Sequence, residues 1–411
     1  MSRSARSSGT VRPAQQPGSA QILRAEGRVS AVGRPDAAEQ PVVPRYQHST
    51  LADLMPSIGA HLGVPDCHDD VVGVPSSQRY VVVLVDGLGW HLVRGAVQDA
   101  PYLAELLGDG RPLTSGVPST TATSLTCLGT GLAPGQHGIV GYTSRVPETG
   151  EILNALTWES DLDARCYQPR STFFERAVDA GVSVSSVAME RFEHSGLTTA
   201  ALRGAEFVAF EREDAIDARI DLVVQAAAAG DRSIVYAYER ELDHTGHALG
   251  CASPQWRTHL RRIDGMCERL RELLPDDVTL VITGDHGMVD VPAQHRLVVQ
   301  DEPELLVGVA ALAGEGRFRQ LYVDDGTAAT VAARWADRLG NLAWVRTRDE
   351  AIAEGWFGPV EARITERYGH VLVAMRSDWA VMTRSQPREL QLVGMHGSLT
   401  AAEMAIPLFC D

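Results

Sequence analysis

The sequence predicts an α/β protein in which helices flank a mainly parallel sheet, with a smaller α+β region inserted before the C-terminal end. First, residues 81–86 form an apolar run closed by Asp86, as in a strand buried on both faces of a parallel sheet. Second, strand-like and helical segments alternate after this run, an order that builds parallel sheets. Third, the texture changes near residue 298, beyond which short strand-like segments surround one helical segment.

Composition limits the classes of function. The chain has 411 residues, 44% of them hydrophobic, which is enough for one large or two unequal domains. Its net charge of −16 would repel nucleic-acid backbones and anionic lipids, so we expect neither nucleic acid nor membrane as a partner. The absence of lysine argues against P-loop and Schiff-base chemistry, since both need that side chain. Without an apolar leader or a stretch of membrane-spanning length, we expect a cytoplasmic protein, of unknown oligomeric state.

The predicted core occupies residues 45–297 and 385–411. Residues 1–44, rich in small and polar residues and free of aromatic ones, are expected to form a disordered tail. Further strands are expected at residues 182–189, 233–238 and 278–283, and helices at residues 121–129, 171–180, 214–229 and 254–274. Ligands of such sheets gather at the carboxyl ends of the strands, where the pattern places Asp86 and Asp285.

Residues 298–384 are expected to form a cap inserted into the core. Short strands are expected at residues 319–323, 342–345, 371–375 and 379–383, around one helix at residues 327–339. Because His396 follows this segment, the cap separates it from the other candidate ligands.

Carboxylates and imidazoles recur where strands are expected to end. Asp243 and His247 are four residues apart, so on a helical turn they would face the same way and could chelate one metal ion. The remaining candidates follow strands or stand between glycines, and they are Asp86, Asp285, His286 and His396. Such a set suits two neighbouring divalent cations of the kind that hydrolases of phosphoryl groups use.

A hydroxyl-rich segment supplies candidate nucleophiles. Residues 118–124 contain five Ser or Thr side chains at the start of an expected helix. Capping a helix needs only one hydroxyl, so capping does not explain the excess. A nucleophile at a helix N-terminus gains from the positive end of the helix dipole, which also favours a bound phosphate.

In these motifs the chain resembles the alkaline phosphatase superfamily. Within that superfamily it is most similar to the nucleotide pyrophosphatase/phosphodiesterase family. The resemblance covers residues 79–406 and includes five motifs in the family's order: Val-Asp86-Gly, Pro118-x-x-Thr121, Thr130-Gly-Leu-x-Pro-Gly-x-His-Gly138, Asp243-x-x-x-His247 with Asp285-His286-Gly287, and Gly-x-His396-Gly. It implies an alkaline-phosphatase-like core and two divalent metal ions, with zinc as the expected metal. By the same resemblance, one ion would be held by Asp243, His247 and His396, and the other by Asp86, Asp285, His286 and the Thr121 oxygen.

The resemblance also assigns the catalytic and substrate-binding roles. Thr121 looks like the nucleophile, because it lies nine residues before Thr130, which is the family spacing. The family's usual Thr-Phe-Pro-Asn reads Thr121-Ala-Thr-Ser124 here, so Ser124 stands where the family has a phosphate-binding Asn. Tyr142 stands where the family often has a second Asn. Ser124 and Tyr142 are therefore the candidate substrate-binding residues.

The expected activity is hydrolysis of phosphodiester or pyrophosphate bonds in a small phosphoester, such as a nucleotide, through a covalent Thr121 intermediate. A phosphomonoesterase or phosphonate hydrolase on the same scaffold is one alternative. A catalytically silent metal-binding protein is the other.

Overall fold

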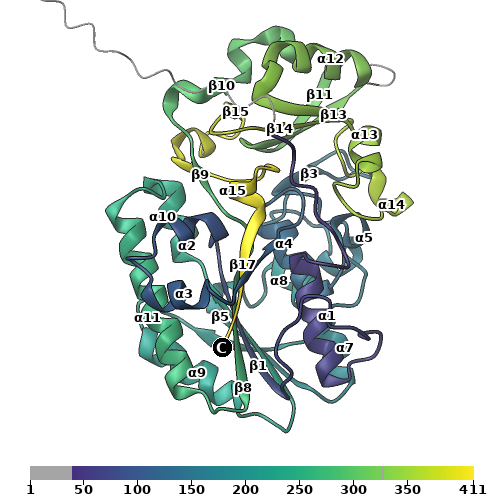
Figure 1. The fold of residues 1–411 in the computed structure, drawn as a ribbon. Helices are drawn as coiled ribbons and strands as arrows, with labels where there is room; N and C mark the ends of the chain where they lie inside the picture. The colour runs from purple at the N-terminus through teal and green to yellow at the C-terminus, as the bar shows by residue number, and fades with distance from the viewer. Residues whose placement is uncertain (1–38, 325–327) are drawn as a thin grey trace, which may run out of the picture.

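The computed structural model describes residues 39–324 and 328–411, and its largest element is a seven-stranded sheet with helices on both faces (Figure 1). The strand order is β2 (Arg111–Thr114), β17 (Ala405–Cys410), β8 (Val278–Gly284), β1 (Arg79–Val85), β7 (Ser233–Glu239), β5 (Ser183–Met189) and β6 (Glu206–Phe210). Strand β17 runs antiparallel to both neighbours, whereas all pairings from β8 to β6 are parallel. The predicted mainly parallel sheet is confirmed, and the four predicted core strands are β1, β5, β7 and β8.

Two helical layers cover the sheet because alternate residues of the buried strands face opposite sides. Tyr80, Val82 and Leu84 of β1 share a core with α1 (Leu51–Leu62), α4 (Thr121–Thr130), α7 (Phe173–Asp179) and α8 (Gly196–Ala201). Val81, Val83 and Val85 share a second core with α2 (Trp90–Gly95), α3 (Pro101–Leu106), α9 (Ile216–Ala227) and α11 (Pro254–Leu273). Burial on both faces accounts for the uninterrupted apolar run. The four predicted core helices correspond to α4, α7, α9 and α11.

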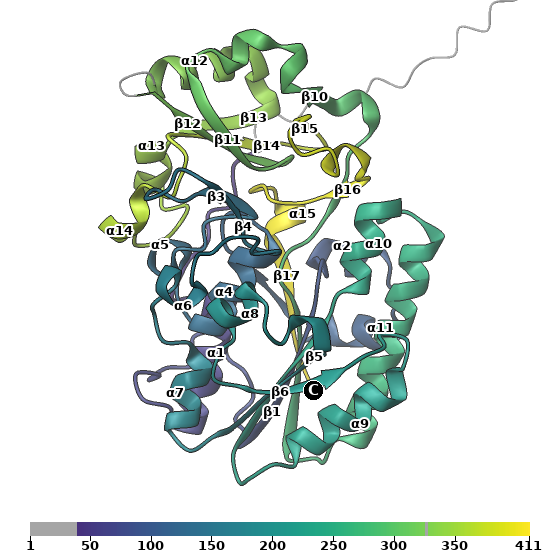
Figure 2. The ribbon, with the colours of Figure 1, turned by 180° about the vertical axis from the view of Figure 1, so that it is seen from behind.

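A second sheet lies at the end of the molecule where the parallel strands terminate (Figures 1 and 2). This antiparallel sheet has the order β11 (Val309–Glu315), β12 (Phe318–Val323), β14 (Val371–Met375) and β13 (Ala343–Thr347). Apolar residues of α12 (Ala328–Leu339) pack against one face of it. Residues 379–383, expected as a cap strand, contain β15 (Ala380–Met382), which pairs with β10 (Arg296–Val298) rather than with this sheet. The division of the chain at residues 298 and 384 stays a prediction.

Shorter elements complete the fold. Strand β9 (Val289–Asp290) pairs with β16 (Gly394–Met395), and β3 (Thr143–Arg145) pairs with β4 (Ile152–Asn154). The short helices are α5 (Pro134–His137), α6 (Ala164–Tyr167), α13 (Arg348–Ala353), α14 (Ala362–Thr365) and α15 (Ala401–Met404), and α10 (Glu241–Leu249) follows β7. In the described part of the chain, no helix has both the length and the hydropathy needed to cross a membrane.

Part of the predicted tail is described by the structure. Of the tail predicted at residues 1–44, residues 1–38 lie outside the described residues. Residues 39–44 are packed against the rest of the protein: the Val42 amide donates to the Leu399 carbonyl at 2.8 Å, and Pro44 is buried. The expectation of disorder was therefore wrong for residues 39–44, because Val42 and Val43 supply apolar surface that reaches a neighbouring core.

Candidate active site

Three adjacent strands bring the candidate carboxylates together. Asp86 follows β1 and Asp285 follows β8, while Asp243 lies on α10, which begins just after β7. Strand β1 pairs with both β7 and β8, so all three residues reach the same edge of the sheet.

The six carboxylate and histidine residues among the seven predicted metal ligands form two clusters. In each, the candidate ligand atoms lie within 4.8 Å of one another, and the members are Asp243, His247 and His396 in one and Asp86, Asp285 and His286 in the other. In the first cluster, His247 Nε2 lies 3.4 Å from Asp243 Oδ2 and 3.2 Å from His396 Nε2. In the second, His286 Nε2 lies 3.4 Å from both Asp86 Oδ1 and Asp285 Oδ2. These are the two sets that the resemblance implied.

Backbone carbonyls fix the tautomer of all three imidazoles. The Nδ1 atoms of His247, His286 and His396 lie 2.8, 3.0 and 2.9 Å from the carbonyl oxygens of Gly394, Gly287 and Ser119. A carbonyl can only accept, so each Nδ1 carries the hydrogen and donates it. A neutral ring held in this way presents its Nε2 lone pair to the cluster, as histidine ligands of metals do.

The charges and unpaired atoms of the clusters fit divalent cations. Asp243 Oδ1 and Asp285 Oδ2 are buried and have no hydrogen-bond donor among the described residues. Burial and the neighbouring Asp285 and Asp243 raise the pKa of Asp86 well above its usual value. Burial, together with His286 and His247, lowers the pKa of His396 well below its usual value. Buried carboxylates beside imidazole lone pairs are satisfied by metal ions, so the residues present fit the group that the sequence implied.

Thr121 is the hydroxyl that faces the clusters. It is the first residue of α4, and its Oγ1 lies 3.2 Å from His286 Nε2 and 3.5 Å from Asp86 Oδ1. The other hydroxyls of residues 118–124 have different partners: Ser119 donates to the Ser398 carbonyl, Thr120 to Glu315, and Thr123 to the Ile139 carbonyl. Thr121 is therefore placed to act as a nucleophile at a helix N-terminus.

The two candidate substrate-binding residues are placed differently. Tyr142 lines the cavity at the clusters, and its hydroxyl accepts a hydrogen bond from Asn154 Nδ2 at 3.1 Å. Ser124 is fully buried, and its Oγ lies 2.9 Å from Ser115 Oγ, away from that cavity. The structure thus brings Tyr142 to the site but not Ser124, because Ser124 turns towards the end of β2.

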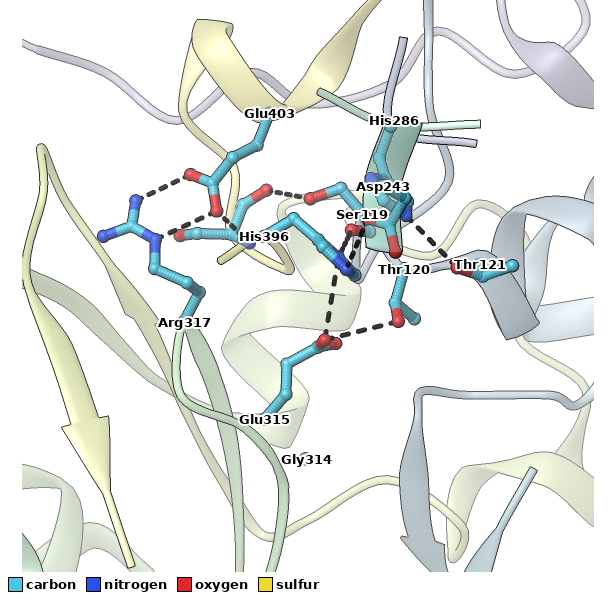
Figure 3. A network of polar contacts seen from close by, with 12 residues as sticks. Ser119, Thr120, Thr121, Asp243, His286, Gly314, Glu315, Arg317, His396 and Glu403 are labelled. Atoms are coloured by element: carbon cyan, nitrogen blue, oxygen red, sulfur yellow. Dashed lines mark hydrogen bonds and ion pairs between the residues drawn. The ribbon is translucent and has the colours of Figure 1, made fainter. Parts of the chain in front are cut away.

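Two further residues touch the site without having been predicted. The Tyr238 hydroxyl donates to Asp86 Oδ2, and Glu315 reaches in from the cap. Figure 3 shows Glu315 between Thr120 and His396: its Oε2 accepts from the Thr120 hydroxyl at 3.3 Å and lies 3.7 Å from His396 Nδ1. Tyr238 ends a predicted strand, so its position at the site could have been anticipated. Glu315 gave no comparable signal, because β11 was not predicted.

A buried ion pair connects the cap to the segment that carries His396. Arg317, in the turn after β11, donates from Nε and Nη2 to the two carboxylate oxygens of Glu403 at 3.0 and 2.6 Å (Figure 3). Both side chains are fully buried. This pair holds the turn next to Glu315 against α15, which follows His396 in the chain.

The clusters open into a cavity of about 490 Å³ that includes Asp86, Thr121, Tyr142, Asp243 and His396 in its lining. Two arginines also line it. Arg240 is paired with Glu213 and Glu241 at 3.1 and 3.0 Å, whereas the exposed Arg388 has no ion pair within the described ranges. The cavity therefore reaches Thr121, all three residues of the first cluster and Asp86 of the second.

Comparisons with known proteins identify a related sequence and similar folds. In a human protein, ectonucleotide pyrophosphatase/phosphodiesterase family member 7, 253 residues align at 27% identity, covering 56% of this chain and 52% of the relative. The chain thus spans about half the length of that relative. Murine ectonucleotide pyrophosphatase/phosphodiesterase 5 superposes with a TM-score of 0.65 at 19% identity, over 80% of this chain and 87% of that one. Phosphonoacetate hydrolase from Sinorhizobium meliloti 1021, in complex with phosphonoformate, superposes with a TM-score of 0.63 at 21% identity, over 82% and 91%.

The family model described as type I phosphodiesterase / nucleotide pyrophosphatase matches residues 80–399, a range that contains Thr121 and both clusters. This protein belongs to the type I phosphodiesterase / nucleotide pyrophosphatase family.

Proposed function

We propose that this protein is a two-metal hydrolase that cleaves phosphodiester or pyrophosphate bonds through a covalent intermediate on Thr121. The observation that carries the proposal is the position of the Thr121 hydroxyl, 3.2 Å from His286 Nε2, at the edge of two clusters of candidate metal ligands. The first cluster would hold one ion, and the second would hold the other together with Thr121 Oγ1. Bound divalent ions would lower the pKa of the Thr121 hydroxyl, neutralise the non-bridging phosphoryl oxygens and stabilise the leaving oxygen.

The protein's own groups position the substrate and provide the nucleophile. Thr121 Oγ1 gives up its proton and forms a bond to phosphorus while the bond to the leaving oxygen breaks and that oxygen takes up a proton. The remaining substituent stays on the Thr121 phosphoester. The N-terminus of α4 presents backbone amides to the phosphoryl group. Water then cleaves the Thr121 ester and regenerates the hydroxyl. Tyr142 and Arg388, which line the cavity, would contact the substrate.

The alternatives differ in the second substituent on phosphorus. A monoester carries more charge than a diester and needs a further cation near its non-bridging oxygens. Arg388, which is exposed and has no ion pair in the described structure, is the cavity arginine that would supply this cation to a monoester. A similar structure, an inactive murine ectonucleotide pyrophosphatase/phosphodiesterase 5, is in complex with AMP, which supports a nucleotide-type substrate. The phosphonoformate complex of phosphonoacetate hydrolase supports the phosphonate alternative. The placement of Thr121 argues against a silent metal-binding protein.

The test compares a 4-nitrophenyl nucleotide diester with 4-nitrophenyl phosphate at one pH and one metal content. We expect the diester to be preferred by about tenfold or more in kcat/KM, which corresponds to about 1.4 kcal/mol of transition-state stabilisation. Chelation should abolish both activities, and adding Zn²⁺ or another divalent ion should restore them. Faster cleavage of the monoester would favour the phosphatase alternative, and full activity after chelation would reject the two-metal proposal.

A further inference from the structure

The cavity continues past the metal-ligand clusters, between the central sheet and helices α4 and α8. We call this part the inner chamber and define it by the lining residues Leu125, Ser186, Ala188, Leu197, Leu202 and Tyr236. Ser186 and Tyr236 lie three residues before the carboxyl ends of β5 and β7. At about 3.3 Å per residue, they are roughly 10 Å from the edge of the sheet where the site lies. The chamber therefore extends inward from the Thr121 hydroxyl.

Two buried hydroxyls of the chamber have no partner. Ser186 and Tyr236 are register neighbours on adjacent strands, so their side chains share one face of the sheet. They are 2% and 1% exposed, and neither hydroxyl has a hydrogen-bond partner in the described part of the chain. Buried hydroxyls in proteins are almost always paired. Two adjacent unpaired hydroxyls in a cavity wall are available to pair with a polar atom of a ligand.

The other residues that define the chamber are apolar and carry no charge, whereas Ser195 and Thr198 at α8 add hydroxyls to the lining of the same cavity. Leu125 lies one turn after Thr121 on the same face of α4, so a group attached to phosphorus meets hydrocarbon first. Ala188, Leu197 and Leu202 continue this apolar surface. Neither arginine of the larger cavity is among the chamber residues: Arg240 is occupied by Glu213 and Glu241, and Arg388 is exposed. A second phosphate or another charged group would be stripped of water here without a counter-charge.

We propose that the inner chamber binds one substituent of the substrate, and that this substituent is uncharged, mainly apolar and carries a hydrogen-bonding atom for Ser186 and Tyr236. An aromatic ring with a carbonyl or hydroxyl group at its far end has this chemistry. A ribose next to phosphorus fits less well, because its hydroxyls would lie against Leu125 and Ala188. This inference rests on the proposed function and narrows its substrate class.

The test measures inhibition constants on the metal-loaded protein for methylphosphonate, phenylphosphonate, 4-acetylphenylphosphonate and adenosine 5′-monophosphate. Phenylphosphonate should bind about tenfold or more tightly than methylphosphonate, because the ring is buried. The acetyl group should add a further factor of about five by pairing with the chamber hydroxyls. The readout is the ratio between inhibitors, so a general change in activity cancels.

Variants then show which residues account for the increases in affinity due to the phenyl and acetyl groups. Ala188→Leu, or Leu197→Phe from a different element, fills the chamber and should reduce the phenyl-to-methyl ratio to near one. Ser186→Ala with Tyr236→Phe should remove the gain due to the acetyl group alone. Ser185→Ala is the matched control, because Ser185 is the buried neighbour on the opposite face of β5 and should leave both ratios unchanged. Melting temperatures show which variants are folded.

The measurements distinguish failure of the chamber, of the substituent class and of the proposed function. The proposal that the chamber binds a substituent is overturned if phenylphosphonate and methylphosphonate bind equally tightly. It is also overturned if the tighter binding of phenylphosphonate persists in both variants that fill the chamber. If adenosine 5′-monophosphate binds more tightly than phenylphosphonate and loses this advantage in the same variants, the chamber binds a nucleoside rather than a mainly apolar substituent. If none of the four compounds competes and chelated protein remains active, the proposed function itself has failed.

Discussion

The buried pair of Arg317 and Glu403 allows a quantitative test of how the cap is attached. Both side chains are 0% exposed, and Glu403 also accepts from the Ser398 amide at 3.0 Å and from the Thr400 hydroxyl. Glu403→Ala would leave a buried guanidinium with carbonyl acceptors but no counter-charge. Removing one partner of such a pair costs about 3–5 kcal/mol, so we expect a loss of that size in the free energy of unfolding.

The assay is denaturant unfolding of the chelated protein, followed by circular dichroism, so that bound metal does not contribute to stability. Asp301→Ala is the control, because it breaks an ion pair in which the side chains of Arg384 and Asp301 are 54% and 62% exposed. This variant should lose less than about 1 kcal/mol in the free energy of unfolding. Replacing Arg317 and Glu403 together by Met and Leu should recover much of the loss. A loss for Glu403→Ala no larger than that of the control would refute the reasoning.

Three other variants test separate parts of the structure. Tyr238→Phe removes the hydrogen bond to Asp86 and should weaken metal affinity about tenfold without unfolding the protein. A metal titration measures this affinity, and an unchanged value would mean that the hydrogen bond has no role in the site. Asp243→Ala should reduce the metal content to about one ion per chain by elemental analysis, and two retained ions would mean that the first cluster is wrongly assigned. Burial and the Glu241 side chain raise the pKa of Glu213 to about 7, so its stabilising contribution is present at low pH and is lost as the pH rises through that value. Glu213→Gln should therefore reduce the fall in melting temperature between about pH 5 and about pH 8, and an unaltered fall would show that this carboxyl is not the group responsible.

The sequence predicted the parts of the site that depend on regular patterns. Asp86 and Asp285 end apolar runs, and the carboxyl ends of neighbouring parallel strands must meet, so their convergence could be expected. Asp243 and His247 are one helical turn apart, which places them on one side of α10. Assigning Thr121 needed the family resemblance, since the hydroxyls beside it share its local pattern.

Other features depend on packing between distant segments and leave no local pattern. Glu315 follows the run Val-Ala-Ala-Leu-Ala-Gly, whose small residues distinguish poorly between strand and helix, so β11 was missed. Ser124 was expected at the substrate because of its place in a motif, but its hydroxyl pairs with Ser115 across 2.9 Å. The inner chamber combines side chains from α4, β5, β7 and α8, and its unpaired hydroxyls become apparent only when the packing is known.

The central claim is that Thr121 is the nucleophile of a two-metal site, and the most direct measurement determines the metal content and turnover of Thr121→Ala beside those of Thr120→Ala. We expect Thr121→Ala to stay folded, to keep at least one ion and to lose diester hydrolysis by at least about a thousandfold. Thr120→Ala should keep most of the activity, since its hydroxyl donates to Glu315 rather than facing the clusters. Near-normal turnover by Thr121→Ala with its metal in place would contradict the account.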